Sequence, residues 1–201
     1  MGLEDAFEKA WDDIRHFEPQ EMCHLAGVAP PDGRGWIWVP MLGENYAVLL
    51  EEGRVLQDGK DPAREDKGLI VLHYLIGAMA LEPSGNLISF RELRGGDVYW
   101  AAYEGRSIRR IQDFFGDRPE ALTEAVTTME HKRAGLGDIG YTIKALPKIP
   151  VTVVVWKGDE EIPAAANVLW DDSIRYFLHT EDVAVLGGIV ASELIKRAPL
   201  D

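Results

Sequence analysis

Cysteine is almost absent from this chain, which has 201 residues and one cysteine, Cys23. A single cysteine cannot form an internal disulfide, and it cannot supply the several thiolates that an iron–sulfur cluster or a structural zinc ion needs. Histidine is also scarce, and the five histidines show no H-E-x-x-H spacing that would indicate zinc. The composition therefore predicts no disulfide and no metal centre that rests on cysteine.

Basic residues and long apolar runs are few as well. The 21 Lys+Arg against 34 Asp+Glu give a net charge of −13, which argues against binding a nucleic-acid phosphate backbone. The longest uncharged apolar stretch, 68–81, is shorter than the roughly 20 residues that cross a bilayer. The acidic start of the chain lacks the apolar core of a signal peptide. We expect a cytoplasmic protein with neither a nucleic-acid nor a membrane partner.

Three stretches indicate the fold class. Val151 to Trp156 is a near-continuous β-branched run, which is typical of a central strand. Residues 69–81 are apolar nearly all round a helix, which predicts a buried helix. Residues 36–56 contain short apolar runs separated by turns, as in an antiparallel meander. These patterns predict an α+β protein with a single mixed, mostly antiparallel sheet and helices packed against it.

We expect one domain over residues 1–201, because no linker or repeat divides the chain. Its three consecutive parts are an N-terminal helix and β-meander (1–60), a helical block (61–135) and an α/β part (136–201).

Residues 135–140 match the G-x-G-x-x-G pattern of dinucleotide binding. That motif works only where a strand precedes it and a helix follows, so that the helix start meets the pyrophosphate. Here we predict a helix before it, from Pro119 to about Arg133, and a strand after it. The glycines are therefore interpreted as a helix-to-strand turn.

The strongest ligand signal is a local reversal of charge. Residues 91–118 contain six arginines against five acids, so this segment is +1 while the remainder is −14. Gly95-Gly96 opens a helix predicted to continue from Asp97 to Phe115, and such a helix start suits a phosphate or a carboxylate. The alternative is a solvated face on which the arginines pair with Glu104 and Asp113. The residues predicted to contact the ligand are Arg106, Arg109, Arg110, Trp100 and Tyr103.

Two further candidates involve a metal. The carboxylates of Asp159, Glu160, Asp171 and Asp172 fall at expected element ends, where they could hold Mg²⁺. Turns and helix caps explain the same acids without any metal. His73 lies in the apolar helix, either as a core histidine or as an axial ligand to a tetrapyrrole metal. No cofactor is identified by these patterns.

The C-terminal part carries a family resemblance. The quoted segments are IPVTVVVWKGDEEIP (149–163), ANVLWDDSI (166–174) and LHTED (178–182), together with Gly140-Tyr141-Thr142 and the stretch 90–95. They resemble the domain-of-unknown-function family numbered 3786. The resemblance covers about the last 110 residues well and the N-terminal meander loosely. Two positions differ from the family pattern: His179 stands where proline is usual, and Trp170 replaces a phenylalanine.

The resemblance implies the kind of metabolism in which the protein takes part, but it does not imply a particular reaction. Members of the family occur in anaerobic bacteria and archaea, and some are fused to an iron–sulfur module of the kind seen in corrinoid proteins. An accessory role near redox or corrinoid chemistry is therefore implied, with no assigned catalytic residue. Because this chain has one cysteine, an iron–sulfur cluster would belong to a partner protein.

Taken together, the residues and the resemblance predict a binding or accessory module rather than an enzyme. It would bind an anionic ligand or a partner protein, the partner being an iron–sulfur or corrinoid protein. The first alternative is a small divalent-metal-dependent hydrolase or transferase that uses the C-terminal carboxylates. The second is a scaffold without a small ligand.

Overall fold

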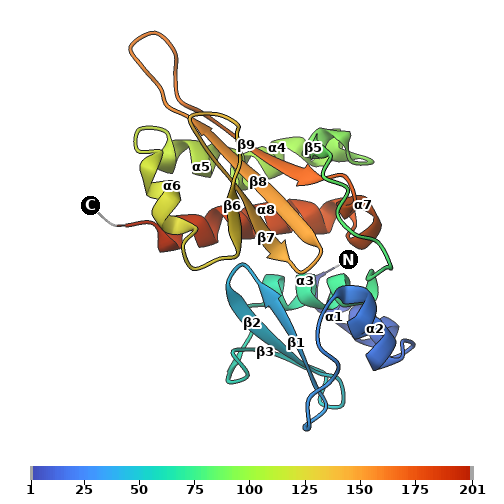
Figure 1. Ribbon diagram of the computed structural model, residues 1–201. Helices are drawn as coiled ribbons and strands as arrows, with labels where there is room; N and C mark the ends of the chain where they lie inside the picture. The colour runs from blue at the N-terminus through green and yellow to red at the C-terminus, as the bar shows by residue number, and fades with distance from the viewer. Residues whose placement is uncertain (1, 200–201) are drawn as a thin grey trace.

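The computed structural model describes residues 2–199 and confirms the α+β class. The strands form two sheets, one of four and one of five strands, where a single mixed sheet was expected. Every strand pair in both sheets is antiparallel. The N-terminal sheet is an open meander in which each strand pairs with the next one along the chain, and a helix follows it in sequence before the strands of the second sheet (Figure 1).

The N-terminal half packs three helices beside the four-stranded sheet. Its helices are α1 (Leu3–Ile14), α2 (Pro19–Ala26) and α3 (Glu65–Ile76). Its strands, paired in chain order, are β1 (Trp36–Met41), β2 (Glu44–Leu49), β3 (Arg54–Gln57) and β4 (Asp61–Pro62). Alternation along β1 sends Ile37 and Val39 into the main core, whereas Trp36 and Trp38 cover a smaller apolar cluster on the opposite face.

The C-terminal half is built on the five-stranded sheet, in the order β5-β9-β8-β7-β6. The strands are β5 (Leu87–Ser89), β6 (His131–Arg133), β7 (Ile139–Leu146), β8 (Ile149–Trp156) and β9 (Ala165–Asp171). The apolar run of residues 151–156 lies in β8, the middle strand, as its composition predicts.

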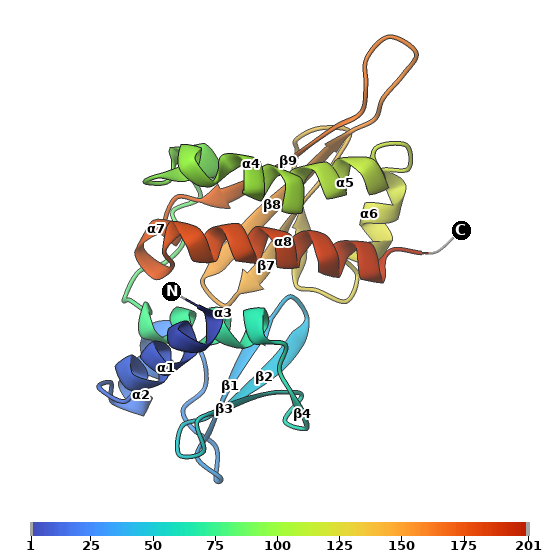
Figure 2. The same ribbon diagram turned by 180° about the vertical axis from the view of Figure 1, so that it is seen from behind.

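Helices cover one face of this sheet. They are the 3₁₀ turn η1 (Phe90–Glu92), α4 (Gly96–Arg106), α5 (Ile108–Phe115), α6 (Glu120–Ala125), α7 (Ile174–Phe177) and α8 (Thr180–Arg197). Figure 2 shows α4, α5 and α8 lying across the sheet on this side. Among the helices of residues 2–199, none combines the length and the apolar character needed to cross a bilayer.

The predicted helices differ from the structure in three places. The buried helix predicted over 69–81 is α3, which begins earlier, at Glu65, and ends at Ile76. The helix expected over 97–115 breaks at Ser107, whose hydroxyl donates to the carbonyl of Tyr103 (2.6 Å). The helix expected from Pro119 to Arg133 ends at Ala125, and residues 131–133 form β6 instead. Pairing with β7 explains the change at residues 131–133, because tertiary hydrogen bonds override the weak helical preference of a short segment.

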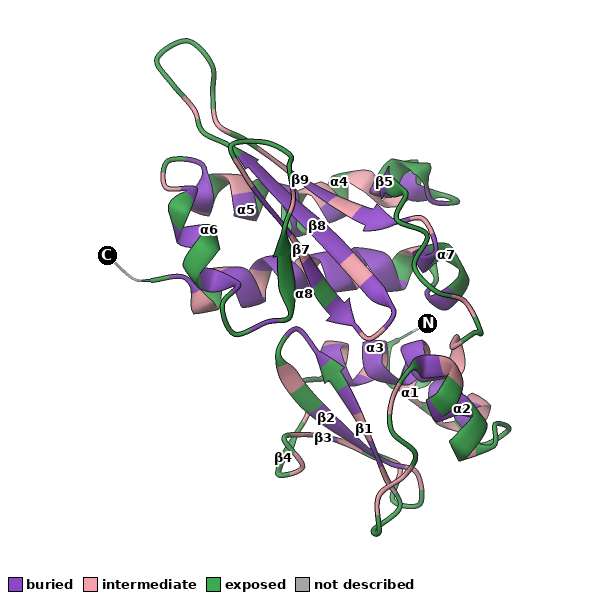
Figure 3. Ribbon diagram, in the orientation of Figure 1, coloured by how far each residue is buried: buried purple, intermediate pink, exposed green. Residues whose placement is uncertain are grey.

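One apolar core joins the two halves of the molecule. A single cluster of buried side chains extends from Ala10 in α1 to Ala198 after α8. The inner face of α8, which the helical spacing of Val183, Leu186, Val190 and Leu194 predicts, is fully buried. Val71, Leu72 and Tyr74 of α3 are fully buried as well. Figure 3 shows this burial concentrated in α3, α8 and the central strands, whereas β6 is exposed.

The glycine-rich motif at 135–140 joins β6 to β7, so a strand lies on each side of it. The expected helix-to-strand turn is therefore a connection between two strands. A helix does not follow the motif, which agrees with its rejection as a dinucleotide site. Gly137 packs directly on Val154 of β8, where a Cβ atom would overlap the valine side chain.

Candidate functional site

A cavity of about 480 Å³ lies where α4 and α8 begin. Figure 2 shows the first turns of both helices at the same end of the molecule, beside α7. The cavity is within the size range of small-molecule sites. It is lined by Leu93, Arg94, Gly95, Tyr99, Arg175, Leu178, His179, Thr180 and Glu181.

Two glycines shape the α4 side of the cavity. Gly95 precedes the helix with a φ of +76°, a left-handed conformation that other residues rarely adopt. Gly96 lies against η1, where a Cβ atom would overlap the carbonyl oxygen of Phe90. The Gly95-Gly96 pair therefore permits the tight turn that places Arg94 at the cavity edge.

The start of α8 is fixed by two side-chain contacts. The hydroxyl of Thr180 donates to the carbonyl of Arg94 (2.8 Å), which ties α8 to the loop before α4. The hydroxyl of Tyr99 donates to Glu181 Oε1 (2.6 Å). This bond, with the backbone N–H of Glu181 itself, lowers the pKa of the Glu181 carboxyl below its usual value. The cavity wall is thus held by bonds between elements about 80 residues apart in sequence.

The cavity carries an excess of positive groups in a protein whose net charge is −13. Arg94 and Arg175 are exposed, and His179 adds an imidazole. The single acid in the lining, Glu181, already accepts the bond from Tyr99. Guanidinium groups bind carboxylates and phosphates through paired N–H donors, and helix starts add a partial positive charge. This arrangement is suited to an anionic ligand.

The structure places the three predicted arginines at the far end of α4 from this cavity. The break at Ser107 puts Arg106 at the end of α4 and the other two in the first turn of α5. Arg109 pairs with Glu104 (3.0 Å), and Arg110 donates to the hydroxyl of Ser192 (2.8 Å). Their role as an anion contact stays a prediction.

The two predicted aromatic walls lie close together but differ in exposure. Trp100 is half-buried, and the guanidinium of Arg91 stacks over its ring at 4.2 Å from the centroid. Tyr103 is fully buried, stacks on Phe90 with the centroids 3.9 Å apart, and accepts the Nε1–H of Trp170 (3.0 Å). Tyr103 is therefore part of the core, whereas Trp100 reaches the surface.

The four predicted carboxylates lie at opposite ends of β9. Asp159 and Glu160 are in the projecting β8–β9 loop, whereas Asp171 ends the strand, so roughly 20 Å of strand separates the pairs. Asp171 is buried and accepts backbone N–H groups of Ser84, Gly85 and Ser173 at 2.6–3.0 Å. Within residues 2–199, no three His, Cys, Asp or Glu side chains come together to hold a metal ion.

His73 lies on α3 with its imidazole about one-quarter exposed. Its Nδ1 is 2.7 Å from Oδ1 of Asp182 on α8, and Asp182 also accepts the backbone N–H of His179 (3.3 Å). The His73–Asp182 pair links α3 in the N-terminal half to α8 in the C-terminal half. Through Asp182 it also contacts the backbone of His179, which lines the cavity. A carboxylate that orients a histidine also occurs beside metals, so the axial-ligand role of His73 stays a prediction.

Within residues 2–199, none of the nine residues that line this cavity is among the residues predicted to contact a ligand, and the two arginines are the most important omissions. Arg94 lies within the arginine-rich segment and directly before Gly95-Gly96, so the helix-start signal could have identified it. Arg175 is 81 residues further along, and no local pattern connects it with Arg94. Only the return of β9 and α7 beside β5 and η1 brings these two arginines to one cavity.

Comparison with known proteins agrees with the resemblance of the C-terminal part. The family described as "Domain of unknown function (DUF3786)" matches residues 18–193, which is most of the chain. The chain therefore belongs to this family. Neither the curated proteins nor the solved structures gave a match. The family match extends over the N-terminal meander as well, where the resemblance is only loose.

Proposed function

We propose that this protein is a binding module that holds a small anionic ligand in the cavity between the starts of α4 and α8. The observation that carries the proposal is the convergence of Arg94, Arg175 and His179 on one cavity of about 480 Å³. We place this binding in the accessory role, beside redox or corrinoid chemistry, that the family resemblance implies.

The chemistry of the cavity favours an anion over a neutral ligand. Within residues 2–199, Arg94 has no carboxylate partner, and Arg175 uses its Nε–H on the backbone carbonyl of Asp172 (3.0 Å). Both guanidinium groups therefore keep N–H donors that a carboxylate or phosphate can accept. The buried side chains of Leu93 and Leu178 form an apolar part of the cavity lining, and hydrogen bonds to charged groups are stronger beside apolar surface than in bulk water.

The overall acidity of the protein does not oppose this site. Interactions between exposed charges are largely screened beyond about 8 Å at physiological ionic strength. A ligand in the cavity therefore responds mainly to the lining groups, which carry two arginines against one acid.

The test compares two double variants that each remove two positive charges. Arg94→Gln/Arg175→Gln changes the cavity, and Arg109→Gln/Arg110→Gln changes the arginines predicted from sequence. Binding of inorganic phosphate, pyrophosphate and citrate would be measured by calorimetry and by the shift of the melting temperature. A ligand at 100 times its dissociation constant adds about 2.7 kcal/mol to the free energy of unfolding.

The expected result is that Arg94→Gln/Arg175→Gln weakens binding by about tenfold or more, since two charge-assisted contacts are lost. The Arg109→Gln/Arg110→Gln protein should bind as the unaltered protein does. The reverse pattern would move the site to Arg106, Arg109 and Arg110. Absence of binding of all three anions to the unaltered protein would refute the proposal.

A further inference from the structure

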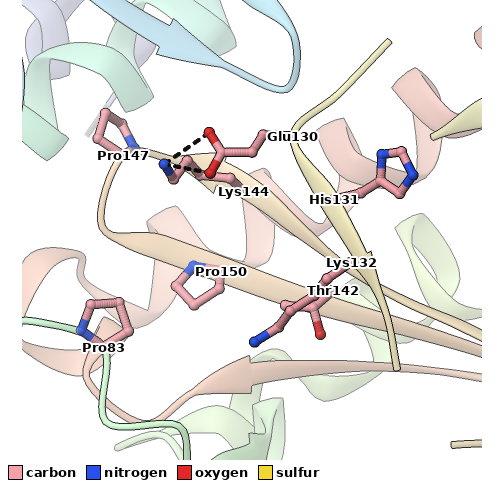
Figure 4. A pocket seen from close by; sticks show the side chains of 8 residues that line it. All are labelled: Pro83, Glu130, His131, Lys132, Thr142, Lys144, Pro147 and Pro150. Carbon is pink, nitrogen blue, oxygen red and sulfur yellow. Dashed lines mark hydrogen bonds and ion pairs between the residues drawn. The ribbon is translucent and has the colours of Figure 1, made fainter. Parts of the chain in front are cut away.

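A second concave site lies on the opposite side of the molecule, on the face of the five-stranded sheet that the helices leave uncovered. This groove, of about 290 Å³, crosses β6, β7 and the start of β8 (Figure 4). It is lined by Pro83, Glu130, His131, Lys132, Thr142, Lys144, Pro147 and Pro150. It shares no lining residue with the cavity at the starts of α4 and α8.

Three prolines form the apolar wall of the groove. Pro147 and Pro150 flank the β7–β8 turn, and Pro83 comes from the segment that leads into β5 (Figure 4). Proline has a rigid ring and no backbone N–H, so this wall is preformed and offers flat C–H surfaces without hydrogen-bond donors. Such surfaces pack well against the face of a planar ring.

Lys132 and Thr142 lie away from Pro147 and Pro83, whereas the ion pair of Lys144 and Glu130 lies beside Pro147 (Figure 4). Lys132 and Thr142 are paired across β6 and β7, so their side chains project to the same face of the sheet, as Figure 4 shows. Lys132 is exposed and has no ion-pair partner among the side chains of residues 2–199. Lys144, by contrast, is neutralised by Glu130 at 2.8 Å. Lys132 is therefore the uncompensated cation of the groove.

Hydrogen bonds already fix the groove floor. The hydroxyls of Thr142 and Thr152 are bonded to each other (2.8 Å), which leaves Thr142 able to contact a ligand with its remaining donor or acceptor capacity. Thr152 is fully buried beneath the groove. A rigid floor and a rigid wall reduce the loss of conformational entropy when a ligand binds.

We propose that this groove binds a small planar organic acid, with its ring against the prolines and its carboxylate on Lys132 and Thr142. One free cation matches one carboxylate, whereas a phosphate-rich ligand would need more positive groups than the groove contains. The volume of about 290 Å³ lies just below the usual range for ligand sites, which fits a single ring rather than a nucleotide. The ligand class therefore differs from that of the arginine cavity.

The probe for this proposal is benzoate, added to the isotopically labelled full chain and followed by backbone amide shifts. Benzamide has the same ring without the charge, and cyclohexanecarboxylate has the same charge without the planar ring. The variants are Lys132→Met and Thr142→Val, with Lys157→Met in the β8–β9 loop as the matched control for loss of one exposed lysine. The Arg94→Gln/Arg175→Gln variant eliminates benzoate binding in the arginine cavity, so that any remaining binding can be assigned to the groove.

We expect saturable benzoate shifts in β6, β7 and the start of β8, which persist in Arg94→Gln/Arg175→Gln and in Lys157→Met. Lys132→Met should weaken benzoate to the level of benzamide, about tenfold or more below the unaltered protein. Three results would overturn the proposal: no saturable shift at millimolar benzoate, equal binding of benzoate and cyclohexanecarboxylate, or binding that is unchanged in Lys132→Met.

Discussion

The ammonium group of Lys67 on α3 lies 2.7 Å from Oε1 of Glu193 on α8, and both side chains are almost completely buried. The same ammonium is 2.6 Å from Oε2 of Glu44 on β2. Arg197 also pairs with Glu193 and donates to the carbonyl of Leu42 (3.2 Å). This network joins the N-terminal sheet and α3 to the last helix of the chain.

The carboxylates of the network are held ionised. Burial by itself would raise the pKa of Glu44, but hydrogen bonds from Lys67 and Tyr46 outweigh burial and lower that pKa to about 2. Burial also acts on Glu193, and bonds from Lys67 and Arg197 lower its pKa in the same way. The network therefore depends on charge compensation, which makes its members sensitive to single substitutions.

Replacing Lys67 with methionine is predicted to destabilise the protein by about 3–5 kcal/mol, because two buried carboxylates lose their shared cation. Urea unfolding would measure the change. Lys9→Met, on the exposed surface of α1, is the control and should change stability by less than about 0.5 kcal/mol. Adding Glu193→Gln to Lys67→Met should recover part of the loss, since one uncompensated charge is removed. Equal stability of Lys67→Met and Lys9→Met would contradict this account of the network.

The free energy of unfolding is predicted to decrease as the pH falls from about 4.5 towards 2. The pKa of Glu44 is lower in the folded protein than in the unfolded chain, so unfolding takes up protons in this range. The stabilisation is complete above the unfolded pKa of about 4.5 and is lost as the folded carboxyl titrates near 2. Urea unfolding at a series of pH values would measure it. In Lys67→Met the pH dependence should be shallower, and an unchanged slope would show that other carboxylates dominate.

Replacing His73 with leucine is predicted to destabilise the protein by about 1–3 kcal/mol, because the buried carboxylate of Asp182 loses a hydrogen-bond partner. Thermal or urea unfolding would measure the effect. His24→Leu is the matched control, since His24 is exposed on α2. If both variants unfold alike, the contact between His73 and Asp182 contributes nothing to the joining of α3 and α8.

Two glycine-to-alanine substitutions are predicted to change the free energy of unfolding in opposite directions. Gly77 follows α3, and a Cβ atom there would overlap the carbonyl oxygen of Phe177 in α7, so Gly77→Ala should cost about 2 kcal/mol or more. Gly105 lies in α4 with no atom within 4 Å of the added Cβ, so Gly105→Ala should add about 0.5–1 kcal/mol. Melting temperatures of the two variants would decide it, and a shift in the same direction for both would contradict the structure.

Several elements could be predicted because their signal is local. The β-branched run of 151–156 lies in the central strand β8, and the inner face of α8 is buried as its helical spacing indicates. Residues 131–133 show where local reasoning fails. Their sequence continues a helical pattern, yet pairing with β7 makes them a strand. The hydrogen bonds that make residues 131–133 a strand are formed with β7. The sequence of residues 131–133 alone does not show that β7 lies beside them.

For the candidate sites too, the sequence shows some of the residues, and only the tertiary structure shows which of them lie together. The arginine-rich segment and the Gly95-Gly96 turn were visible in the sequence, but the cavity also needs Arg175, which the strand order brings from 81 residues away. The acidic residues 159–172 look like one cluster in sequence, yet β9 holds them apart because an extended strand adds about 3.3 Å per residue. Periodicity and composition determined the type and the burial of the long elements with a strong local signal, such as β8 and α8. Which side chains meet was decided only by tertiary pairing, because the same local elements can be joined in several strand orders that bring different residues together.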